Sequence, residues 1–500
     1  MSDSEHYWQA IASTKPQRLT ALFDTDPDRL DRLTVEEAGL YFDFSKTHLD
    51  GALVEAFEGL AGAQELGKKR DALFAGEPIN ISEGRAAEHM AQRGQGAPDS
   101  VALARTLHMR MRALIDAIEA GALGEIRHIL HLGIGGSALG PDFVIDALGR
   151  DDPAYDVAVV SNVDGAALEG PFTLFDPEYT LVVIASKSFT TAETMLNAES
   201  ALQWMRNAGV VDPFGQMVAL TAQPDAAVAF GIDQTRVLPF PDTVGGRYSL
   251  WSSIGFPIAL ALGWEAFEQM LEGAAAMDRH FRFTEWNRNA PALAAFADLY
   301  YAQTRRAETR AIFAYEERLR LLPSYLQQLE MESNGKAANA DGQPLTRASS
   351  PIVWGGVGTD AQHAVFQLLH QGTHLVPVEF VAVAEAHDHR DPAHHEQLLV
   401  NCFAQGSALM TGRASDDPAR HFAGDRPSST ILLERLDPAS LGALLAFYEH
   451  RTFVNAALLG INPFDQFGVE LGKDIARAIA GDEDTLELDA STRALIDRAL

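Results

Sequence analysis

Two glutamates beside a turn signal are candidates for acid–base chemistry in this chain. Glu330 and Glu332 lie in YLQQLEMESNGK, residues 325–336. Because they are two positions apart, a helix points them in different directions, and we expect one of them to face a cleft. Glu332 is followed by Ser-Asn-Gly, which favours the end of an element there, where catalytic groups are often found. A solvated helix face is the alternative.

A hydroxyl-rich segment, ASKSFTTAET at residues 185–194, has the composition of a phosphate-binding loop. It follows a predicted strand and precedes a predicted helix. Hydroxyls and free N–H groups at a helix start suit a phosphate monoester, which needs many donors. The alternative is a helix cap with more Ser and Thr than it needs. The candidate residues are Ser186, Lys187, Ser188, Thr190, Thr191 and Thr194.

A glycine-rich turn, HLGIGGSALGP at residues 131–141, follows another predicted strand. Gly135, Gly136 and Ser137 can bring backbone N–H groups close to an anion. The spacing differs from the dinucleotide fingerprint, and the next strand ends at Ser161 and Asn162 without an acid for a ribose. The pattern therefore disfavours a nucleotide cofactor. A tight turn needed for packing remains the alternative.

Arg247 follows two glycines in VGGRYSLWSSIG, residues 244–255. A guanidinium held in such a frame can stabilise developing oxyanion charge. A surface arginine after a turn is the alternative.

Two histidines and one late lysine complete the set of candidates. His363 and His370 are seven positions apart in GTDAQHAVFQLLHQG, so on a helix they share a face, which suits packing as well as catalysis. A zinc site would require histidines at i and i+4 with an acid, so we expect no metal site here. Lys473 follows Gln466 in NPFDQFGVELGK, where a solvated helix face is the alternative.

Alternating strands and helices must position these groups. Residues 1–100 have helical spacing, residues 101–275 and 276–437 each alternate strands with helices, and residues 438–500 return to helix. We therefore expect an α/β fold with two sandwich domains, mainly parallel sheets, and helical terminal segments. The predicted strands are 127–132, 157–161, 181–186, 217–221, 235–238, 310–315, 352–355 and 376–383.

The charge balance excludes several classes of protein. There are 39 Lys and Arg against 69 Asp and Glu, a formal net charge of −30, which disfavours nucleic acid and anionic membranes as partners. The single Cys402 forms no internal disulfide. The N-terminus has no apolar leader, and the longest apolar stretch, near 254–264, is shorter than a membrane span. We expect a cytoplasmic protein.

Taken together and in this order, these segments resemble the glucose-6-phosphate isomerase (phosphoglucose isomerase) family. The similarity runs from about residue 130 to 475. It implies two sugar-isomerase-type (SIS) three-layer αβα domains and a cytoplasmic homodimer with shared active sites. It also implies reversible aldose–ketose isomerisation of glucose 6-phosphate and fructose 6-phosphate in glycolysis and gluconeogenesis, without a metal or organic cofactor.

The resemblance also implies a role for each matching residue. Glu332 matches the base that moves a proton between C1 and C2, and Arg247 matches the group facing the enediolate. His363 matches a ring-opening histidine that reaches across from the partner subunit, and Lys473 assists it. Phosphate contacts fall on Ser186, the Lys187 backbone, Ser188, Thr191 and Thr194, and sugar or substrate contacts on Gly136, Ser137, Gln328 and Gln466.

Some positions depart from the common family pattern. They are Ala138 for Asp, Ser188 for Thr, Asp360-Ala361 for Asn-Gly and Phe467 for Trp. None removes a named catalytic group. An isomerase of dual specificity, acting also on mannose 6-phosphate, and a sugar-phosphate-binding regulator without catalysis are the alternatives. Lys336, close to Glu332, receives no role from the sequence.

Overall fold

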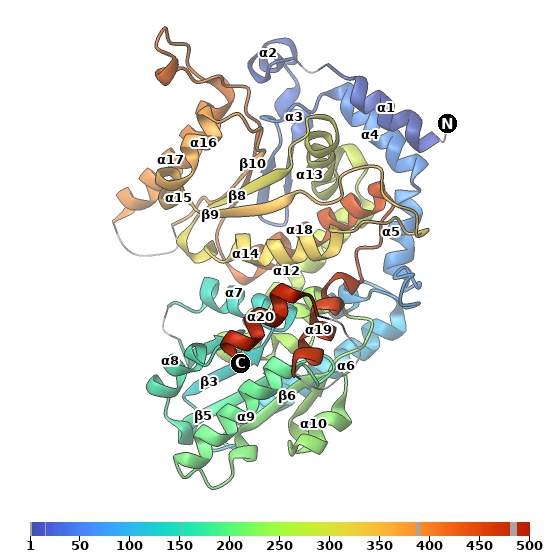
Figure 1. Cartoon of the computed structure of the whole chain (residues 1–500). Coiled ribbons are helices and arrows are strands. Elements are labelled where there is room, and N and C mark those ends of the chain that lie inside the picture. The colour runs from blue at the N-terminus through green and yellow to red at the C-terminus, as the bar shows by residue number, and fades with distance from the viewer. Residues whose placement is uncertain (1–2, 16, 152, 387–390, 481–487) are drawn as a thin grey trace. The chain divides into compact units, whose positions relative to one another are not determined.

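The computed structural model describes residues 3–15, 17–151, 153–386, 391–480 and 488–500. These divide into two compact units, Met1–Pro463 and Phe464–Leu500. Within the first unit, the described residues form two sheets (Figure 1). The prediction of an α/β fold with mainly parallel sheets is confirmed.

The first sheet has the strand order β4-β3-β5-β6-β7, and each neighbouring pair is parallel. Its strands are β3 (His128–Gly133), β4 (Asp156–Val160), β5 (Thr180–Ala185), β6 (Met217–Thr221) and β7 (Val237–Pro239). The predicted strands in this region match them to within two residues at each end. Continuous apolar runs make these strands recognisable, because a parallel sheet is covered on both faces.

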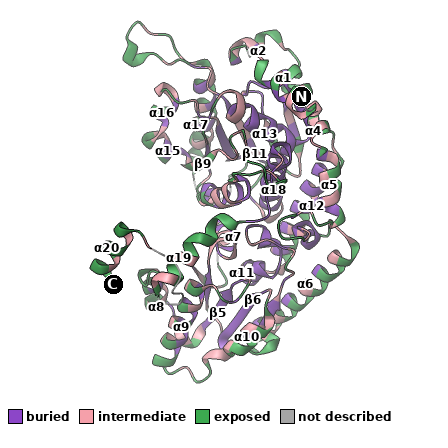
Figure 2. Cartoon of the chain, turned by 45° about the vertical axis from the view of Figure 1, so that its right-hand side comes forward, coloured by how far each residue is buried: buried purple, intermediate pink, exposed green. Residues whose placement is uncertain are grey.

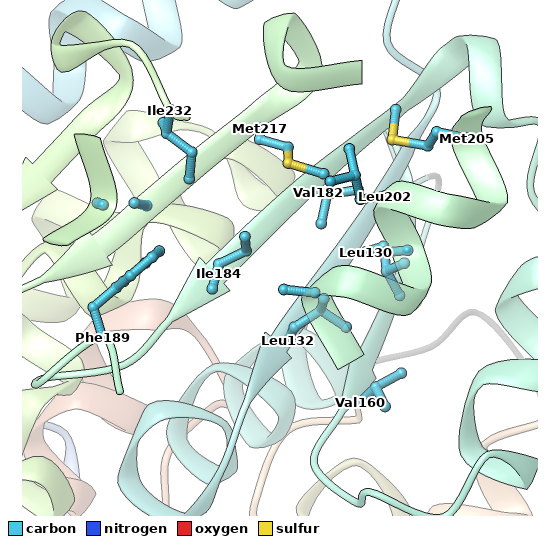
Figure 3. Close-up of a cluster of buried hydrophobic side chains, with 14 of the residues drawn as sticks. Leu130, Leu132, Val160, Val182, Ile184, Phe189, Leu202, Met205, Met217 and Ile232 are labelled. Atoms are coloured by element: carbon cyan, nitrogen blue, oxygen red, sulfur yellow. The ribbon is translucent and has the colours of Figure 1, made fainter. Parts of the chain in front are cut away.

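Alternate side chains of the first sheet build a core against three helices (Figure 3). Leu130, Val182, Ile184 and Met217 pack there, together with Leu202 and further residues from the helices. The helices are α8 (Ala166–Leu174), α9 (Ala192–Asn207) and α10 (Pro224–Phe230). Because all strands run the same way, the loops after β3 and β5 emerge at one edge of the sheet.

The second sheet has the order β1-β2-β11-β10-β8-β9 and is parallel from β11 to β9. Its strands are β1 (Thr34–Glu37), β2 (Leu40–Asp43), β8 (Thr309–Tyr315), β9 (Ile352–Val357), β10 (Val378–Val383) and β11 (Ser428–Leu433). The prediction of helix throughout residues 1–100 is wrong for the segments that form β1 and β2. They form a hairpin turning at Ala38 and Gly39, both with positive φ, and β2 pairs antiparallel with β11.

Helices cover both faces of the second sheet. One face packs against α15 (Gly358–Ala364), α16 (Phe366–Gln371) and α17 (Pro392–Thr411). The other meets α18 (Pro438–Leu459), whose residues from Ser440 to Leu459 are all buried (Figure 2). An Asp437–Ser440 capping box begins α18 and Gly460, with φ of 70°, ends it. The predicted helix after Pro438 is confirmed, and it is the central helix of the first unit.

Other helices complete the first unit. They are α1 (Asp3–Ser13), α2 (Leu19–Thr25), α3 (Arg29–Leu33), α4 (Gly51–Ala63), α5 (Leu66–Ala75), α6 (Pro98–Glu119), α7 (Leu139–Leu148), α11 (Phe256–Leu262), α12 (Trp264–Phe283), α13 (Ala290–Leu299) and α14 (Leu322–Leu326). The second unit contains α19 (Glu470–Ala480) and α20 (Ala490–Ala499). In the described part of the chain, no helix has the length and apolar character needed to cross a membrane.

Candidate active site

Arg247 and Glu332, which are 85 positions apart in the chain, meet in the folded protein. Arg247 is 4% exposed in a short 3₁₀ helix, Gly246–Trp251, and Glu332 ends a π-helix, Gln327–Glu332. Arg247 Nη1 lies 3.4 Å from Glu332 Oε1, and the Glu332 side chain keeps 23% of its surface exposed. A reachable carboxylate beside a fixed cation can remove a proton and stabilise the resulting oxyanion.

The guanidinium of Arg247 is held by neighbours on both sides. Its Nε donates to Ser333 Oγ at 2.6 Å, and its Nη2 donates to the carbonyl of Pro463. Tyr248 Oη lies 2.9 Å from the same Ser333 Oγ. Sequence reasoning missed the roles of Ser333 and Tyr248. The signals were their positions directly after Glu332 and Arg247.

The glycine turn packs against the helix that carries Arg247. A Cβ at Gly136 would lie 2.2 Å from the carbonyl of Gly246, so this contact excludes any side chain. Gly135 has a φ of 57°, and a Cβ there would lie 2.8 Å from Gln328 Nε2. The structure therefore brings the glycine turn, Gln328 and the Arg247 helix together.

Ser137, at the end of the turn, is tied to a buried histidine. His131 Nε2 lies 2.7 Å from the Ser137 carbonyl. Burial lowers the pKa of His131 to about 4, so the ring is neutral at physiological pH and Nε2 donates to the carbonyl. This bond fixes the backbone of the glycine turn.

The hydroxyls of Ser186, Ser188, Thr190 and Thr191 lie between β5 and α9, and Thr194 lies in the first turn of α9. Ser186 Oγ and Thr191 Oγ1 are 3.1 Å apart, and Thr190 Oγ1 donates to Ser188 Oγ at 2.8 Å. Thr191 stands at the N-cap of α9 but makes no side-chain capping bond there. Thr194 Oγ1 is buried and has no partner among the described residues. Simple capping does not account for this arrangement, whereas an anion at the N-terminus of α9 would find donors there.

Lys187 joins this loop to the segment that precedes Arg247. Its Nζ donates to the carbonyls of Asp242 at 2.6 Å and Val244 at 3.1 Å. Burial, reinforced by Arg85, lowers the pKa of Lys187 to about 8. Its ammonium is therefore occupied by the carbonyl oxygens of that segment.

Three further predicted site residues are described separately. His363 is exposed on α15, and no contact described for it reaches Arg247 or Glu332. Gln466 and Lys473 belong to the second unit, Lys473 within α19. Lys336, for which the sequence predicts no role, donates from Nζ to the Glu332 carbonyl at 3.0 Å.

A metal centre and a thiol nucleophile are the other kinds of reactive site that these residue types could form. Among the described residues, no group of three or more His, Cys, Asp and Glu is arranged to hold a metal ion. Cys402 is buried, and burial raises its pKa to about 12, so its thiol is not a nucleophile at neutral pH.

Comparisons with known proteins agree along the whole chain. The family model of phosphoglucose isomerase matches residues 43–496. Glucose-6-phosphate isomerase of Rhizorhabdus wittichii is 67% identical over 500 residues, covering 100% of both chains. That of Zymomonas mobilis is 63% identical and covers 99% of this chain and 97% of its own. The crystal structure of a glucose-6-phosphate isomerase from Chlamydia trachomatis superposes with a TM-score of 0.91 at 32% identity, covering 100% of this chain and 99% of its own.

Proposed function

The chain belongs to the phosphoglucose isomerase family, and from this premise we propose how its residues share the reaction. The protein is an enzyme with glucose-6-phosphate isomerase activity, interconverting glucose 6-phosphate and fructose 6-phosphate in glycolysis and gluconeogenesis. The observation that carries the proposal is the 3.4 Å approach of Arg247 Nη1 to Glu332 Oε1.

Glu332 is the base in this proposal. In the open-chain aldose, the hydrogen on C2 is acidic because it is adjacent to the C1 carbonyl. The carboxylate removes this proton and the C–H electrons form the C1–C2 double bond of a cis-enediolate. Transfer of the proton of the C2 hydroxyl to the C1 oxygen moves the negative charge to O2. Return of the proton from Glu332 to C1 then forms the C2 carbonyl of the ketose, so one carboxylate above the plane serves both carbons. Arg247 stabilises the oxyanion, since it is positioned before the charge develops.

Residues 186–194 hold the phosphate in this proposal. Ser186, Ser188, Thr191 and Thr194 supply hydroxyls, and the Lys187 backbone adds an N–H donor. Support comes from the bonds between hydroxyls and from the uncapped N-terminus of α9. Neutral donors bind a dianion with little loss of hydration from charged side chains, which suits a chain of net charge −30. Gly136, Ser137, Gln328 and Gln466 contact the sugar in the same proposal.

Ring opening needs a second acid–base group, which we assign to His363 of the partner subunit in a cytoplasmic homodimer, assisted by Lys473. The exposure of His363 on α15 and the absence of a described contact to Glu332 support this arrangement. The buried, lone Cys402 is compatible with a reducing compartment. Cell fractionation that recovers the enzyme outside the cytoplasm would contradict the location.

Mixed dimers test the shared site. We expect Glu332→Gln and His363→Ala chains each to be nearly inactive with fructose 6-phosphate. After unfolding and refolding together, half of the dimers pair the two variants and have one complete site, so activity returns to about a quarter of the wild-type value. Refolding each variant alone is the control. No recovery in a mixture shown by mass spectrometry to contain mixed dimers would contradict sharing of His363.

Incubation of the enzyme with fructose 6-phosphate in D₂O tests the reaction itself. The proton held by Glu332 exchanges with solvent before it returns, so we expect glucose 6-phosphate carrying deuterium at C2, measured by NMR. Absence of both product and exchange would overturn the assignment. Appearance of mannose 6-phosphate would instead show dual specificity.

A further inference from the structure

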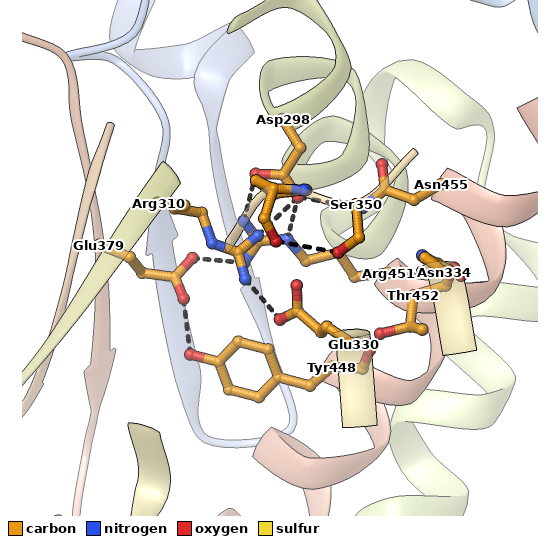
Figure 4. Close-up of polar contacts among 11 residues, drawn as sticks. Asp298, Arg310, Glu330, Asn334, Ser350, Glu379, Tyr448, Arg451, Thr452 and Asn455 are labelled. Atoms are coloured by element: carbon orange, nitrogen blue, oxygen red, sulfur yellow. Dashed lines mark hydrogen bonds and ion pairs between the residues drawn. The ribbon is translucent and has the colours of Figure 1, made fainter. Parts of the chain in front are cut away.

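Glu330 occupies the same π-helix as Glu332 but points into the core. It is 2% exposed and forms an ion pair with Arg310 of β8 through Glu330 Oε1 and Arg310 Nη2. Figure 4 shows the carboxylate directed at the guanidinium. The expectation that only one of the two glutamates would be accessible therefore holds in this structure, and the buried one is paired.

The ion pair is the end of a longer network in the core (Figure 4). Arg310 Nη1 donates to Asp298 of α13 at 2.7 Å. Asp298 also accepts two hydrogen bonds from Arg451 of α18, each 2.6 Å. Arg451 Nη1 donates to Glu379 of β10 at 2.6 Å. Glu330 is thus connected to two strands and two helices that contain no residue of the proposed reaction.

A second anchor lies on the other side of Glu332. Asn334 is 3% exposed, and its Nδ2 donates to the Thr452 carbonyl of α18 at 3.0 Å. Glu332 therefore stands between two buried attachments, at Glu330 and Asn334. A π-helix of six residues has few backbone hydrogen bonds of its own, and these do not fix how it is rotated about its axis. The buried attachments therefore decide which of its side chains face the substrate.

The buried charges of this network require one arrangement, in which each carboxylate is paired with an arginine. Although burial acts to raise it, Arg310 and Arg451 hold the pKa of Asp298 down at about 2. Burial raises the pKa of Glu330 despite the neighbouring arginines. Breaking such a buried pair leaves an uncompensated polar group, whereas making it adds little net stability. We therefore expect the Glu330–Arg310 ion pair to define the local conformation and to add little to the free energy of unfolding.

We infer that the Glu330–Arg310 ion pair is a positioning device for the active site, which fixes the rotation of the helix Gln327–Glu332 so that Glu332 faces Arg247 and Gln328 faces Gly135. Glu330 is a positioning residue and does not touch the substrate. The inference rests on the proposed role of Glu332 as the base.

Matched substitutions of two buried carboxylates test this inference. Glu330→Met keeps the side-chain length and removes the acceptor for Arg310. Glu379→Met makes the same change at a site in the same network but outside the π-helix. A displacement of about 1 Å at a reacting group costs up to about 100-fold in rate. We expect Glu330→Met to lower kcat by about 10- to 100-fold with KM for fructose 6-phosphate changed less than about twofold.

The control variant separates positioning from general stability. Glu379→Met is expected to lower the melting temperature by a similar amount and to keep kcat within about threefold of wild type. Glu330→Gln, which retains an oxygen acceptor, is expected to recover most of the lost kcat. Wild-type kcat in Glu330→Met, or equal losses of kcat in both Met variants, would overturn the inference.

Two further measurements keep the inference testable if Glu330→Met does not fold or if Glu332 is not the base. Should Glu330→Met not fold, as judged by circular dichroism, the pair Glu330→Gln and Glu379→Gln gives the same comparison, with a kcat loss of about threefold expected for the first alone. Unchanged turnover in Glu332→Gln would contradict the proposed base itself. Wild-type kcat in the Glu330 variants, together with lost turnover in Glu332→Gln, would contradict only the positioning role of Glu330.

Discussion

Glu332→Gln is expected to lower kcat for fructose 6-phosphate by about 10³-fold or more, since positioned acid–base groups contribute about 10² to 10⁴ and the Glu332 carboxylate lies 3.4 Å from Arg247 Nη1. Gln has nearly the same shape but cannot accept the C2 proton. The phosphate loop is untouched, so affinity for fructose 6-phosphate should stay within about threefold of wild type, measured by calorimetry.

Ring opening provides an internal control for this variant. If His363 and Lys473 open the ring, Glu332→Gln should still interconvert the anomers of fructose 6-phosphate while losing deuterium exchange at carbon. NMR distinguishes the two rates in one sample. Loss of both processes with intact binding would mean that Glu332 also takes part in ring opening. Undiminished isomerisation would place the base elsewhere.

The sequence was sufficient for most of the fold because parallel strands leave a local signal. Runs such as residues 217–220 and 181–185 are apolar throughout, since both faces of their sheet are buried. The hairpin β1–β2 gave no such signal. Its strands are four residues each, and β2 pairs with β11 from nearly 400 positions away. Only that long-range pairing decides between strand and helix there.

The sequence alone indicates candidate site residues where their type and spacing suggest chemistry, as at the glycine turn and the hydroxyl loop, and their roles there stay predictions. The contacts that hold the Arg247 guanidinium could not be predicted in this way. Ser333 resembles a turn residue and Tyr248 an apolar anchor until the fold brings both to the guanidinium. Lys336 likewise gains its contact with the Glu332 carbonyl from the way the chain turns after the π-helix. Such contacts depend on tertiary structure, which one sequence does not disclose.

Arg247→Lys is expected to lower kcat by about 10² to 10³, close to the effect of Arg247→Met. The change keeps the charge, but a single ammonium cannot reproduce three directed contacts. In the wild type, Nε donates to Ser333 and Nη2 to Pro463, while Nη1 faces Glu332. Lysine would have a mobile point charge in place of a fixed planar group, so part of the stabilisation of the enediolate is lost.

Ser333→Ala separates charge from orientation at this position. It leaves the guanidinium in place and removes one of the groups that orient it, so we expect a kcat loss of about 10-fold, smaller than for Arg247→Lys, with KM little changed. Steady-state kinetics of the three variants then rank the contributions. If Arg247→Lys retained wild-type kcat, a point charge alone would suffice to stabilise the enediolate. In that case the contacts of Arg247 with Ser333 and Pro463 would serve folding of the Gly246–Trp251 helix, and the Ser333→Ala variant would lose stability without losing turnover.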